Sequence, residues 1–181
     1  MGKSNLLIEL YSNLSTTGAL TFSSKALVKK MVTQVDLKDA DIIVELGGGD
    51  GSITQGIINQ MGPQTKLLVF EINSSFCEEM RKQFDNPNVQ IINDSADQIE
   101  NYLNGEKVDF ILSSLPFSFI SKEITDSILS QSRSVLNQGG AFIQICYSYL
   151  LKNLFKKYFP EVNVSFTLKN LPPAFVMVCQ S

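Results

Sequence analysis

The sequence predicts a doubly wound α/β domain, and three observations carry that prediction. Short apolar runs rich in β-branched residues alternate with segments of helical periodicity along most of the chain. The run at 42–46 leads directly into a glycine-rich turn at 47–51 (GGGDG), which opens a helix. An acid, Glu71, ends the next strand 20 residues after Gly51. This succession is typical of nucleotide-binding α/β folds.

The composition limits the classes of function. A chain of 181 residues is long enough for one domain with a substantial core, so we expect 1–181 to form a single domain, with 1–35 as an N-terminal helical cap. The net charge of −3 disfavours a dedicated nucleic-acid binder, which is usually basic. The absence of histidine excludes Ser-His-Asp and Cys-His hydrolases. Three isolated cysteines predict neither a disulfide framework nor a metal site.

The N-terminal segment leaves two interpretations open. Residues 1–16 place apolar side chains at helical spacing, which suits a helix that caps the core. It also suits a helix that lies on a membrane surface or covers the substrate, although Lys3 is its single basic residue. The first 20 residues lack the pattern of a secretory signal, and no apolar run approaches the length of a membrane-spanning helix, so we expect a cytoplasmic protein.

The remaining elements follow from periodicity and turn residues. We predict helices at 22–35, 53–60, 75–84, 97–102, 121–136 and 149–158, and strands at 42–46, 66–71, 89–92, 108–112, 141–147, 162–168 and 174–179. Turns are predicted at 62–63, 86–88, 137–140 and 170–173. Ser75 and Glu78 have the spacing of a capping box at the start of their helix. The basic segment 149–158 either contacts anionic lipid headgroups or is a surface helix whose lysine stems cover the core.

The glycine turn favours S-adenosylmethionine over a dinucleotide. Its spacing is G-x-G-x-G rather than G-x-G-x-x-G, and Glu45 stands two residues before Gly47. A carboxylate there repels a pyrophosphate but suits a ligand with an ammonium or sulfonium group. Gly47, Gly49 and Gly51 allow the backbone to approach such a ligand closely. The alternative is a plain strand-to-helix turn with additional glycine.

Two further strand ends carry candidate ligands for a nucleoside. Glu71, followed by Ile72, stands where an acid holds ribose hydroxyls in nucleotide-binding folds. Asp94 follows the third predicted strand and has the small neighbours Ser95 and Ala96. Its carboxylate can bind an adenine amino group or cap the helix that follows, and one residue could serve both purposes.

The stretch 113–117 (SSLPF) after the fourth strand suits an amine substrate. Pro116 biases Leu115 towards an extended conformation, so the carbonyls of 113–115 can point into the cleft and accept hydrogen bonds from an amine. The Phe117 ring can face the ammonium that develops as a methyl group arrives. The alternative is an ordinary loop with a core phenylalanine. Methyl transfer to an amine needs positioning and desolvation more than a strong base, so it is compatible with the absence of histidine.

These motifs resemble those of class I S-adenosylmethionine-dependent methyltransferases over nearly the whole chain. The matching stretches are ELGGGDG at 45–51, Glu71, DSA at 94–96, SLPF at 114–117 and LNQGG at 136–140. The resemblance implies a doubly wound seven-stranded, mostly parallel sheet with an antiparallel last strand. It also implies S-adenosylmethionine as the cofactor, with Glu45 at the methionine end, Glu71 on the ribose and Asp94 on the adenine. The implied cofactor-binding set is Glu45, Gly47, Gly49, Gly51, Glu71, Ile72, Asp94, Ser95, Ala96 and Ser113.

Two subfamilies resemble the chain in different stretches. The rRNA adenine dimethylases have a similar Leu-Pro-Phe stretch, but they carry Asn where this chain has Ser114, and they are basic and have a further helical domain. The bacterial phospholipid N-methyltransferases are similar at 18–24, at 113–116 and at 170–174 (NLPPA), the last being far from the cofactor motifs.

The second resemblance implies an N-methyltransferase for the amine headgroup of a phospholipid such as phosphatidylethanolamine. It implies peripheral contact with the inner membrane face and no nucleic-acid partner. The residues implied to hold the amine for in-line attack are Ser114, Leu115, Pro116 and Phe117, and those implied at the substrate entrance are Phe22, Tyr147 and Tyr149. Two alternatives remain: an rRNA adenine or small-molecule amine methyltransferase, and a cofactor-binding module without turnover.

Overall fold

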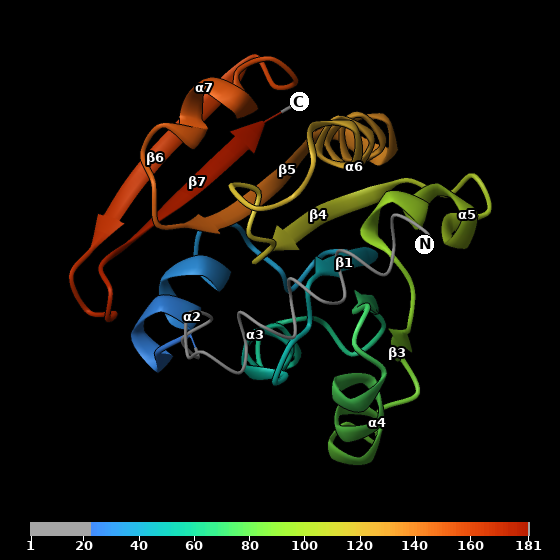
Figure 1. The fold of residues 1–181 in the computed structure, drawn as a ribbon. Coiled ribbons are helices and arrows are strands. Elements are labelled where there is room, and N and C mark those ends of the chain that lie inside the picture. The colour runs from blue at the N-terminus through green and yellow to red at the C-terminus, as the bar shows by residue number, and fades with distance from the viewer. Residues whose placement is uncertain (1–22, 181) are drawn as a thin grey trace.

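A seven-stranded sheet in the order β3-β2-β1-β4-β5-β7-β6 forms the centre of the molecule (Figure 1). The computed structural model describes residues 23–180. The strands are β1 Ile42–Leu46, β2 Lys66–Phe70, β3 Val89–Ile92, β4 Val108–Ser113, β5 Leu136–Cys146, β6 Glu161–Thr167 and β7 Ala174–Gln180. The helices are α2 Lys25–Val32, α3 Ser52–Ile58, α4 Ser74–Gln83, the short 3-10 helix η1 Ala96–Gln98, α5 Ile99–Leu103, α6 Lys122–Val135 and α7 Leu151–Phe155.

The strand directions confirm the predicted fold class. The pairs β1–β2, β1–β4, β2–β3 and β4–β5 are parallel. The last strand, β7, runs antiparallel to both β5 and β6, so β6 again points the same way as β1 to β5. The carboxyl ends of β1 to β6 therefore lie at one edge of the sheet, where ligands bind in open α/β folds.

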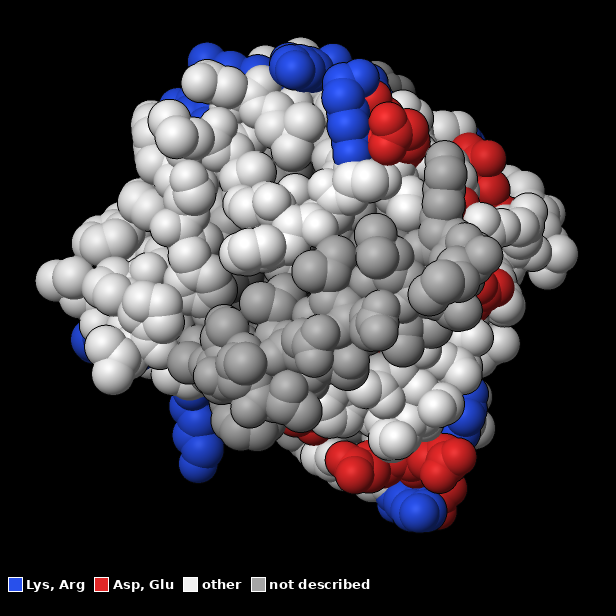
Figure 2. Space-filling view, viewed as in Figure 1, with Lys and Arg blue, Asp and Glu red and all other residues white. Residues whose placement is uncertain are grey.

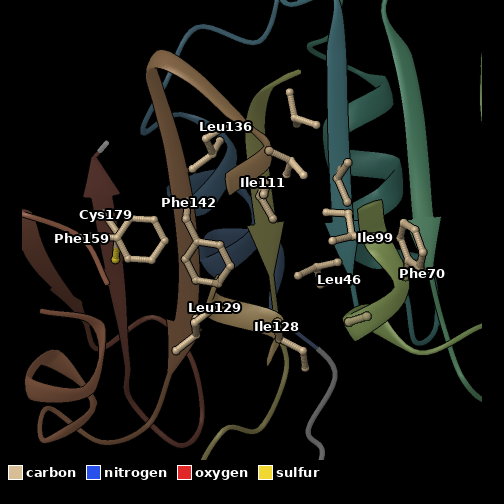
Figure 3. Close-up of a cluster of buried hydrophobic side chains, with 14 of the residues drawn as sticks. Leu46, Phe70, Ile99, Ile111, Ile128, Leu129, Leu136, Phe142, Phe159 and Cys179 are labelled. Atoms are coloured by element: carbon tan, nitrogen blue, oxygen red, sulfur yellow. The ribbon is translucent and has the colours of Figure 1, made fainter. Parts of the chain in front are cut away.

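Helices cover both faces of the sheet, which explains why most strands read as continuous apolar runs. The side chains of β1 alternate between the two faces. Ile43 packs in the cluster that contains α2, α3 and α4, and Leu46 packs in the cluster that contains α5, α6 and α7. Figure 3 shows part of the second cluster, in which Leu46, Ile111 and Phe142 from three strands meet helix residues such as Ile128.

The structure differs from the predictions mainly at the ends of elements. The predicted capping box at Ser75 is wrong, because α4 begins earlier and Asn73 is its N-cap. The Asn73 side chain accepts hydrogen bonds from the backbone N–H groups of Ser75 and Phe76 at 2.9 and 3.4 Å, and Asn is as good an N-cap as Ser. The predicted turn at 137–140 lies within β5, where Gly139 has a φ of 82°.

The N-terminal predictions are only partly covered by the described residues. The predicted helix at 22–35 is α2, and the Ser24 side chain caps it by accepting a hydrogen bond from Leu27 N at 3.2 Å. The predicted helix at 1–16 and the candidate substrate residue Phe22 lie outside the described residues. Within 23–180, the structure contains no helix with the length and apolarity needed to cross a membrane.

Candidate active site

A pocket lies at the carboxyl edge of the sheet, where β1 has β2 on one side and β4 on the other. From β1 the chain continues to β2 and β3 on one side, and it then crosses back to β4 on the other side of β1. Open α/β folds bind their ligands at the point where the strand order reverses in this way. The pocket is open to solvent and mostly apolar, with a few polar groups in its wall, as is usual for small-molecule sites. It is lined by Gly47, Phe70, Glu71, Ile72, Asp94, Ser95, Ala96, Leu115, Pro116, Phe119, Ile120, Ile124 and Ile128.

The glycine turn places backbone without side chains beside this pocket. The N–H groups of Gly47 and Gly48 both donate to the Phe70 carbonyl, at 2.9 and 3.1 Å, and this fixes the turn against the end of β2. Gly47 has a φ of +85°, and a Cβ there would lie 3.1 Å from both the Leu115 Cδ2 and the Ser114 Oγ. A larger residue would therefore be strained and would crowd the loop opposite the turn.

The other two predicted glycines support the turn and are not among the residues that line the pocket. Gly49 has a φ of 53°, and its N–H donates to the Glu71 Oε2 at 2.9 Å. Gly51 has a φ of 79° and is the N-cap of α3. Both positions use the left-handed backbone region that glycine adopts most readily.

Glu71 holds the glycine turn and also faces the pocket. Its side chain is 2% exposed, and its second oxygen, Oε1, accepts from Asn73 N at 2.8 Å. Glu71 thus presents a carboxylate at the pocket, and a carboxylate accepts hydrogen bonds from hydroxyl groups of the kind that a ribose carries.

Asp94 lies on the same pocket wall and is bound to a tyrosine that the sequence did not single out. Its Oδ2 accepts from the Tyr102 hydroxyl at 2.8 Å, and its Oδ1 accepts from Ser95 N at 2.7 Å. The hydrogen bond to Asp94 raises the pKa of Tyr102. Ser95 rather than Asp94 is the N-cap of η1, so the helix-cap interpretation of Asp94 does not hold.

Glu45 is a buried carboxylate with little compensation from the protein. It is 1% exposed, and neither oxygen has a hydrogen-bond donor in good geometry among the residues that the structure describes. Burial raises the pKa of Glu45 to about 8, the hydroxyl of Thr54 offsets this in part, and the charge of Glu71 adds to it. Glu45 is not among the pocket-lining residues, but it stands two residues before Gly47. A buried carboxylate with so little compensation favours a cationic ligand group beside it.

The loop after β4 is attached to the glycine turn by Ser114. The Ser114 hydroxyl donates to the Gly47 carbonyl at 2.9 Å, and Ser114 N donates to the Leu46 carbonyl at 3.0 Å. Ser113 is fully buried, and its oxygen accepts from Leu115 N at 3.3 Å, so its side chain turns back onto its own loop. Of the predicted residues here, Leu115 and Pro116 line the pocket.

The aromatic side chain that faces the pocket is not the one the sequence indicated. Phe117 is 4% exposed, and its ring packs against Phe155 and Phe142 at centroid distances of 5.6 and 6.4 Å. The ring is therefore packed in the core, and the predicted contact of this ring with a developing ammonium is not what the structure shows. Phe119, which is 57% exposed, lines the pocket instead.

The Leu115 carbonyl is also arranged differently from the prediction. It accepts from Phe117 N at 3.0 Å and from the side-chain amide of Gln144 on β5, also at 3.0 Å. Both of its lone pairs are thus engaged by the protein. Gln144 is fully buried in an otherwise apolar stretch of β5. A single polar residue in such a stretch is the feature of the sequence that could have indicated its role.

The tyrosines predicted at the substrate entrance are not among the residues that line the pocket. Tyr147 and Tyr149 are 43% and 51% exposed. The Tyr149 ring packs 5.8 Å from the ring of Phe175 near the start of β7, so the Tyr149 side chain lies against one of the outer strands.

The pocket residues fit S-adenosylmethionine. Acids at the ends of β2 and β3 suit a ribose and an adenine, the glycine turn suits close packing, and the buried Glu45 suits a cationic end. With a sheet of this order, the fold and the pocket define a class I S-adenosylmethionine-dependent methyltransferase. Residues 43–140, more than half of the chain, match the family described as a methyltransferase domain, and the chain belongs to that family.

The names of two relatives illustrate different kinds of substrate. The chain is 27% identical to an ornithine lipid N-methyltransferase from Singulisphaera acidiphila, over 95% of this chain and 92% of that protein. It is 28% identical to ribosomal RNA small subunit methyltransferase A from Mycoplasma mycoides, over 54% of this chain and 37% of that protein.

Solved structures show the same fold. A precorrin-6y C5,15-methyltransferase from Geobacter metallireducens superposes with a TM-score of 0.74 at 14% identity, covering 90% of this chain and 92% of that one. A Streptococcus mutans methyltransferase solved in complex with SAH gives a TM-score of 0.65 at 20% identity, covering 86% of this chain and 97% of that one. S-adenosylmethionine is accordingly the cofactor of this chain.

Proposed function

We propose that the chain is an N-methyltransferase that methylates the amine of a membrane-lipid headgroup. The observation that carries the proposal is the extent of the match to the ornithine lipid N-methyltransferase, which covers nearly the full length of both proteins. An ornithine lipid and phosphatidylethanolamine both present a primary amine on a lipid, so the proposal names the lipid amine as the substrate class. Phosphatidylethanolamine and an ornithine lipid are the two headgroups to test first.

An RNA substrate is the second candidate and has weaker support. The matches to three of the rRNA enzymes cover 54, 52 and 64% of this chain and 37, 33 and 45% of those proteins. The net charge of −3 also lacks the excess of basic residues that phosphate binding uses. RNA is therefore included as a possible methyl acceptor in the experiment described below.

Ser114 is the residue that we propose to receive the amine. Its hydroxyl uses its one hydrogen to bind the Gly47 carbonyl, so its oxygen lone pairs can accept a hydrogen bond from a substrate N–H. The hydroxyl lies against the glycine turn, since a Cβ on Gly47 would be 3.1 Å from the Ser114 Oγ. An amine held there would sit beside the cofactor site.

The cofactor, when bound, supplies an electrophilic methyl group on its sulfonium. The amine can attack only as the neutral base, with its lone pair free. The pocket wall near Ser114 is apolar, with Pro116, Phe119 and Ile120, and an apolar environment lowers the pKa of an amine. The chain would thus hold the amine neutral and aligned, and the proton lost on methylation would pass to water. Positioning of this kind requires no histidine.

The test is transfer of radiolabelled methyl groups from S-adenosylmethionine to lipid vesicles. Three vesicle types differ only in headgroup: phosphatidylethanolamine, an ornithine lipid, and phosphatidylcholine, whose nitrogen is already fully methylated. A fourth reaction contains RNA. We expect label in one or both primary-amine lipids and none in phosphatidylcholine.

Two variants give the controls. Glu71→Gln keeps the shape of the side chain but removes its charge, and it should abolish transfer by weakening cofactor binding. Glu106→Gln changes an exposed acid that pairs with Lys66 on the surface, and it should leave transfer unchanged. Label in RNA alone would overturn the lipid proposal. Binding of S-adenosylhomocysteine with no transfer to any acceptor would support the cofactor-binding module instead.

A further inference from the structure

We propose that an apolar surface at the β6–β7 end of the sheet docks on an anionic lipid bilayer. This docking surface consists of Tyr149, Leu150, Phe166, Leu168 and Leu171. The inference rests on the proposed function, because a lipid amine can reach the pocket only if the protein sits at the membrane interface. The surface is separate from the residues that line the pocket.

The exposure of these side chains is the first observation. Leu150, Leu168 and Leu171 are 76, 75 and 84% exposed, and Tyr149 and Phe166 are about half exposed. Single exposed apolar residues are common, but a cluster of them marks a contact surface. The aromatic members are linked, since the rings of Tyr149 and Phe166 both pack against Phe175, at 5.8 and 5.0 Å. Figure 2 shows that the side of the molecule over β6 and β7 carries few charged residues.

The loop that carries Leu168 and Leu171 is held in place by polar contacts. Asn170, between Leu168 and Leu171, is 6% exposed, and its Oδ1 accepts from Ser24 N at 3.0 Å. Its Nδ2 donates to the Pro172 carbonyl at 2.8 Å, and the Ser24 hydroxyl donates to the Lys169 carbonyl at 2.7 Å. The loop is thus tied to the N-terminus of α2 while both leucines remain outside. A fixed loop with projecting leucines suits insertion into an apolar layer.

The docking surface lies at the same edge of the sheet as the pocket. Because β6 runs parallel to β1 and β4, the loop that follows it emerges at the carboxyl edge. Tyr149 and Leu150 follow β5 at that edge, and Figure 1 shows the β6–β7 loop near the end of β5 that leads to them. A bilayer in contact with this surface therefore brings headgroups to the side on which the pocket opens.

The distribution of charge favours an anionic bilayer. Residues 127–181 contain five basic side chains and a single acid, Glu161, although the whole chain has a net charge of −3. Lys169 lies between the two leucines of the loop, and Lys152 Nζ is 5.6 Å from the centre of the Tyr149 ring. Basic residues beside inserted apolar side chains are the combination that binds anionic membranes. Projecting leucines distinguish this surface from an RNA-binding one, which would present stacking rings and arginines.

A single tryptophan provides the test, because the natural chain has none. Leu171→Trp places the reporter in the docking surface. Gln90→Trp, the matched control, places it at an exposed position of β3, at the opposite end of the sheet. On adding vesicles of phosphatidylcholine and phosphatidylglycerol, we expect the Leu171→Trp emission to shift to the blue and to be quenched by brominated lipid tails. The Gln90→Trp emission should not change.

Several results would overturn the inference. An unchanged Leu171→Trp emission with vesicles would do so. A blue shift that depends on protein concentration in the absence of lipid would assign the surface to a second copy of the chain, and a shift with RNA but not with vesicles would assign it to nucleic acid.

A pair of substitutions that adds negative charge to the loop separates this inference from the proposed function. Leu168→Asp/Leu171→Asp should bind the vesicles at least tenfold more weakly, whereas Gln90→Asp/Asn101→Asp, with the same added charge on distant exposed residues, should bind normally.

If the leucine pair loses methylation of vesicles but keeps methylation of the same lipid in detergent, the docking surface is supported. If wild type methylates vesicles and the leucine pair does so equally well, the docking surface is refuted and the function stands. If wild type binds vesicles through this surface but methylates no lipid, the proposed function is refuted and the docking surface stands.

Discussion

Ser114 donates its hydroxyl hydrogen to the carbonyl of Gly47 across 2.9 Å. This bond joins the loop after β4 to the turn after β1, two segments 67 residues apart in the sequence. It also fixes the direction of the hydroxyl, because the single hydrogen points at the turn and the lone pairs point away from it. The amine acceptor that we propose therefore depends on a contact with the cofactor turn.

Removing this acceptor should slow methyl transfer without weakening cofactor binding. For Ser114→Ala we expect kcat/KM for the lipid amine to fall about 10- to 100-fold, which corresponds to roughly 1.4–2.7 kcal/mol for one lost hydrogen bond to the reacting group. The dissociation constant of S-adenosylhomocysteine, measured by calorimetry, should change little. A Ser114→Ala enzyme with full activity would show that the amine is held elsewhere.

Glu45 should make the unliganded protein less stable as the pH rises. Burial raises its pKa from 4.5 to about 8, so between these pH values the folded protein binds a proton that the unfolded chain has released, and stability falls through that window. The full effect is on the order of 4 kcal/mol at pH 8. Glu45→Gln cannot titrate. The Tm of wild type relative to Glu45→Gln should therefore decrease from pH 5 to pH 8, and parallel Tm curves would contradict the account.

The same group should make cofactor affinity depend on pH. If the ionised Glu45 binds a cationic part of the ligand, the affinity of wild type for S-adenosylhomocysteine should increase with pH and level off above pH 8, where the carboxyl is ionised without the ligand. Glu45→Gln should bind more weakly with a flatter profile. Equal pH profiles in the two proteins would assign the dependence to the ligand or to another residue.

Phe117 and Phe119 should respond in opposite ways to truncation. Phe117→Ala removes a core ring that packs on Phe142 and Phe155, and it should cost roughly 3–5 kcal/mol of unfolding free energy. Phe119→Ala removes a ring that is 57% exposed, so stability should change by about 0.5 kcal/mol or less, while cofactor or substrate binding weakens. Urea unfolding and calorimetric binding of S-adenosylhomocysteine measure the two effects. Reversed effects would mean that the rings exchange places in solution.

These two phenylalanines also show which part of the site the sequence does not predict. The strands and the glycine turn could be predicted because apolar runs and glycine spacing are local, and Glu71 and Asp94 could be placed because strand ends share one edge of a parallel sheet. Nothing local decides which of two rings, two residues apart in one loop, turns into the core. That choice depends on Phe142 and Phe155, which lie further along the chain. The exposure of Leu168 and Leu171 likewise depends on how Asn170 ties their loop to α2.

Gln144 should act on activity more than on stability. Its amide holds the Leu115 carbonyl at 3.0 Å, but its Oε1 is buried without a donor among the described residues. Gln144→Met, which is similar in size, loses the amide's hydrogen bonds to the Leu115 and Ile145 carbonyls and also removes the unpaired oxygen. These effects on stability should partly cancel and leave a change of about 1 kcal/mol. We expect kcat to fall, because the loop that carries Ser114 is less firmly held. Thermal unfolding and transfer kinetics on the same preparation give the two values, and unchanged kcat would refute this positioning role.

Mass spectrometry of the lipid itself tests most directly whether the amine of a lipid headgroup is the substrate. Vesicles that contain phosphatidylethanolamine and an ornithine lipid are incubated with S-adenosylmethionine and either wild type or Ser114→Ala, and the extracted lipids are analysed intact and as headgroup fragments. We expect wild type to add one or more methyl groups to the nitrogen of a primary-amine lipid, and Ser114→Ala to do so much more slowly. Unmodified lipids from a wild-type protein that binds S-adenosylhomocysteine would contradict this expectation.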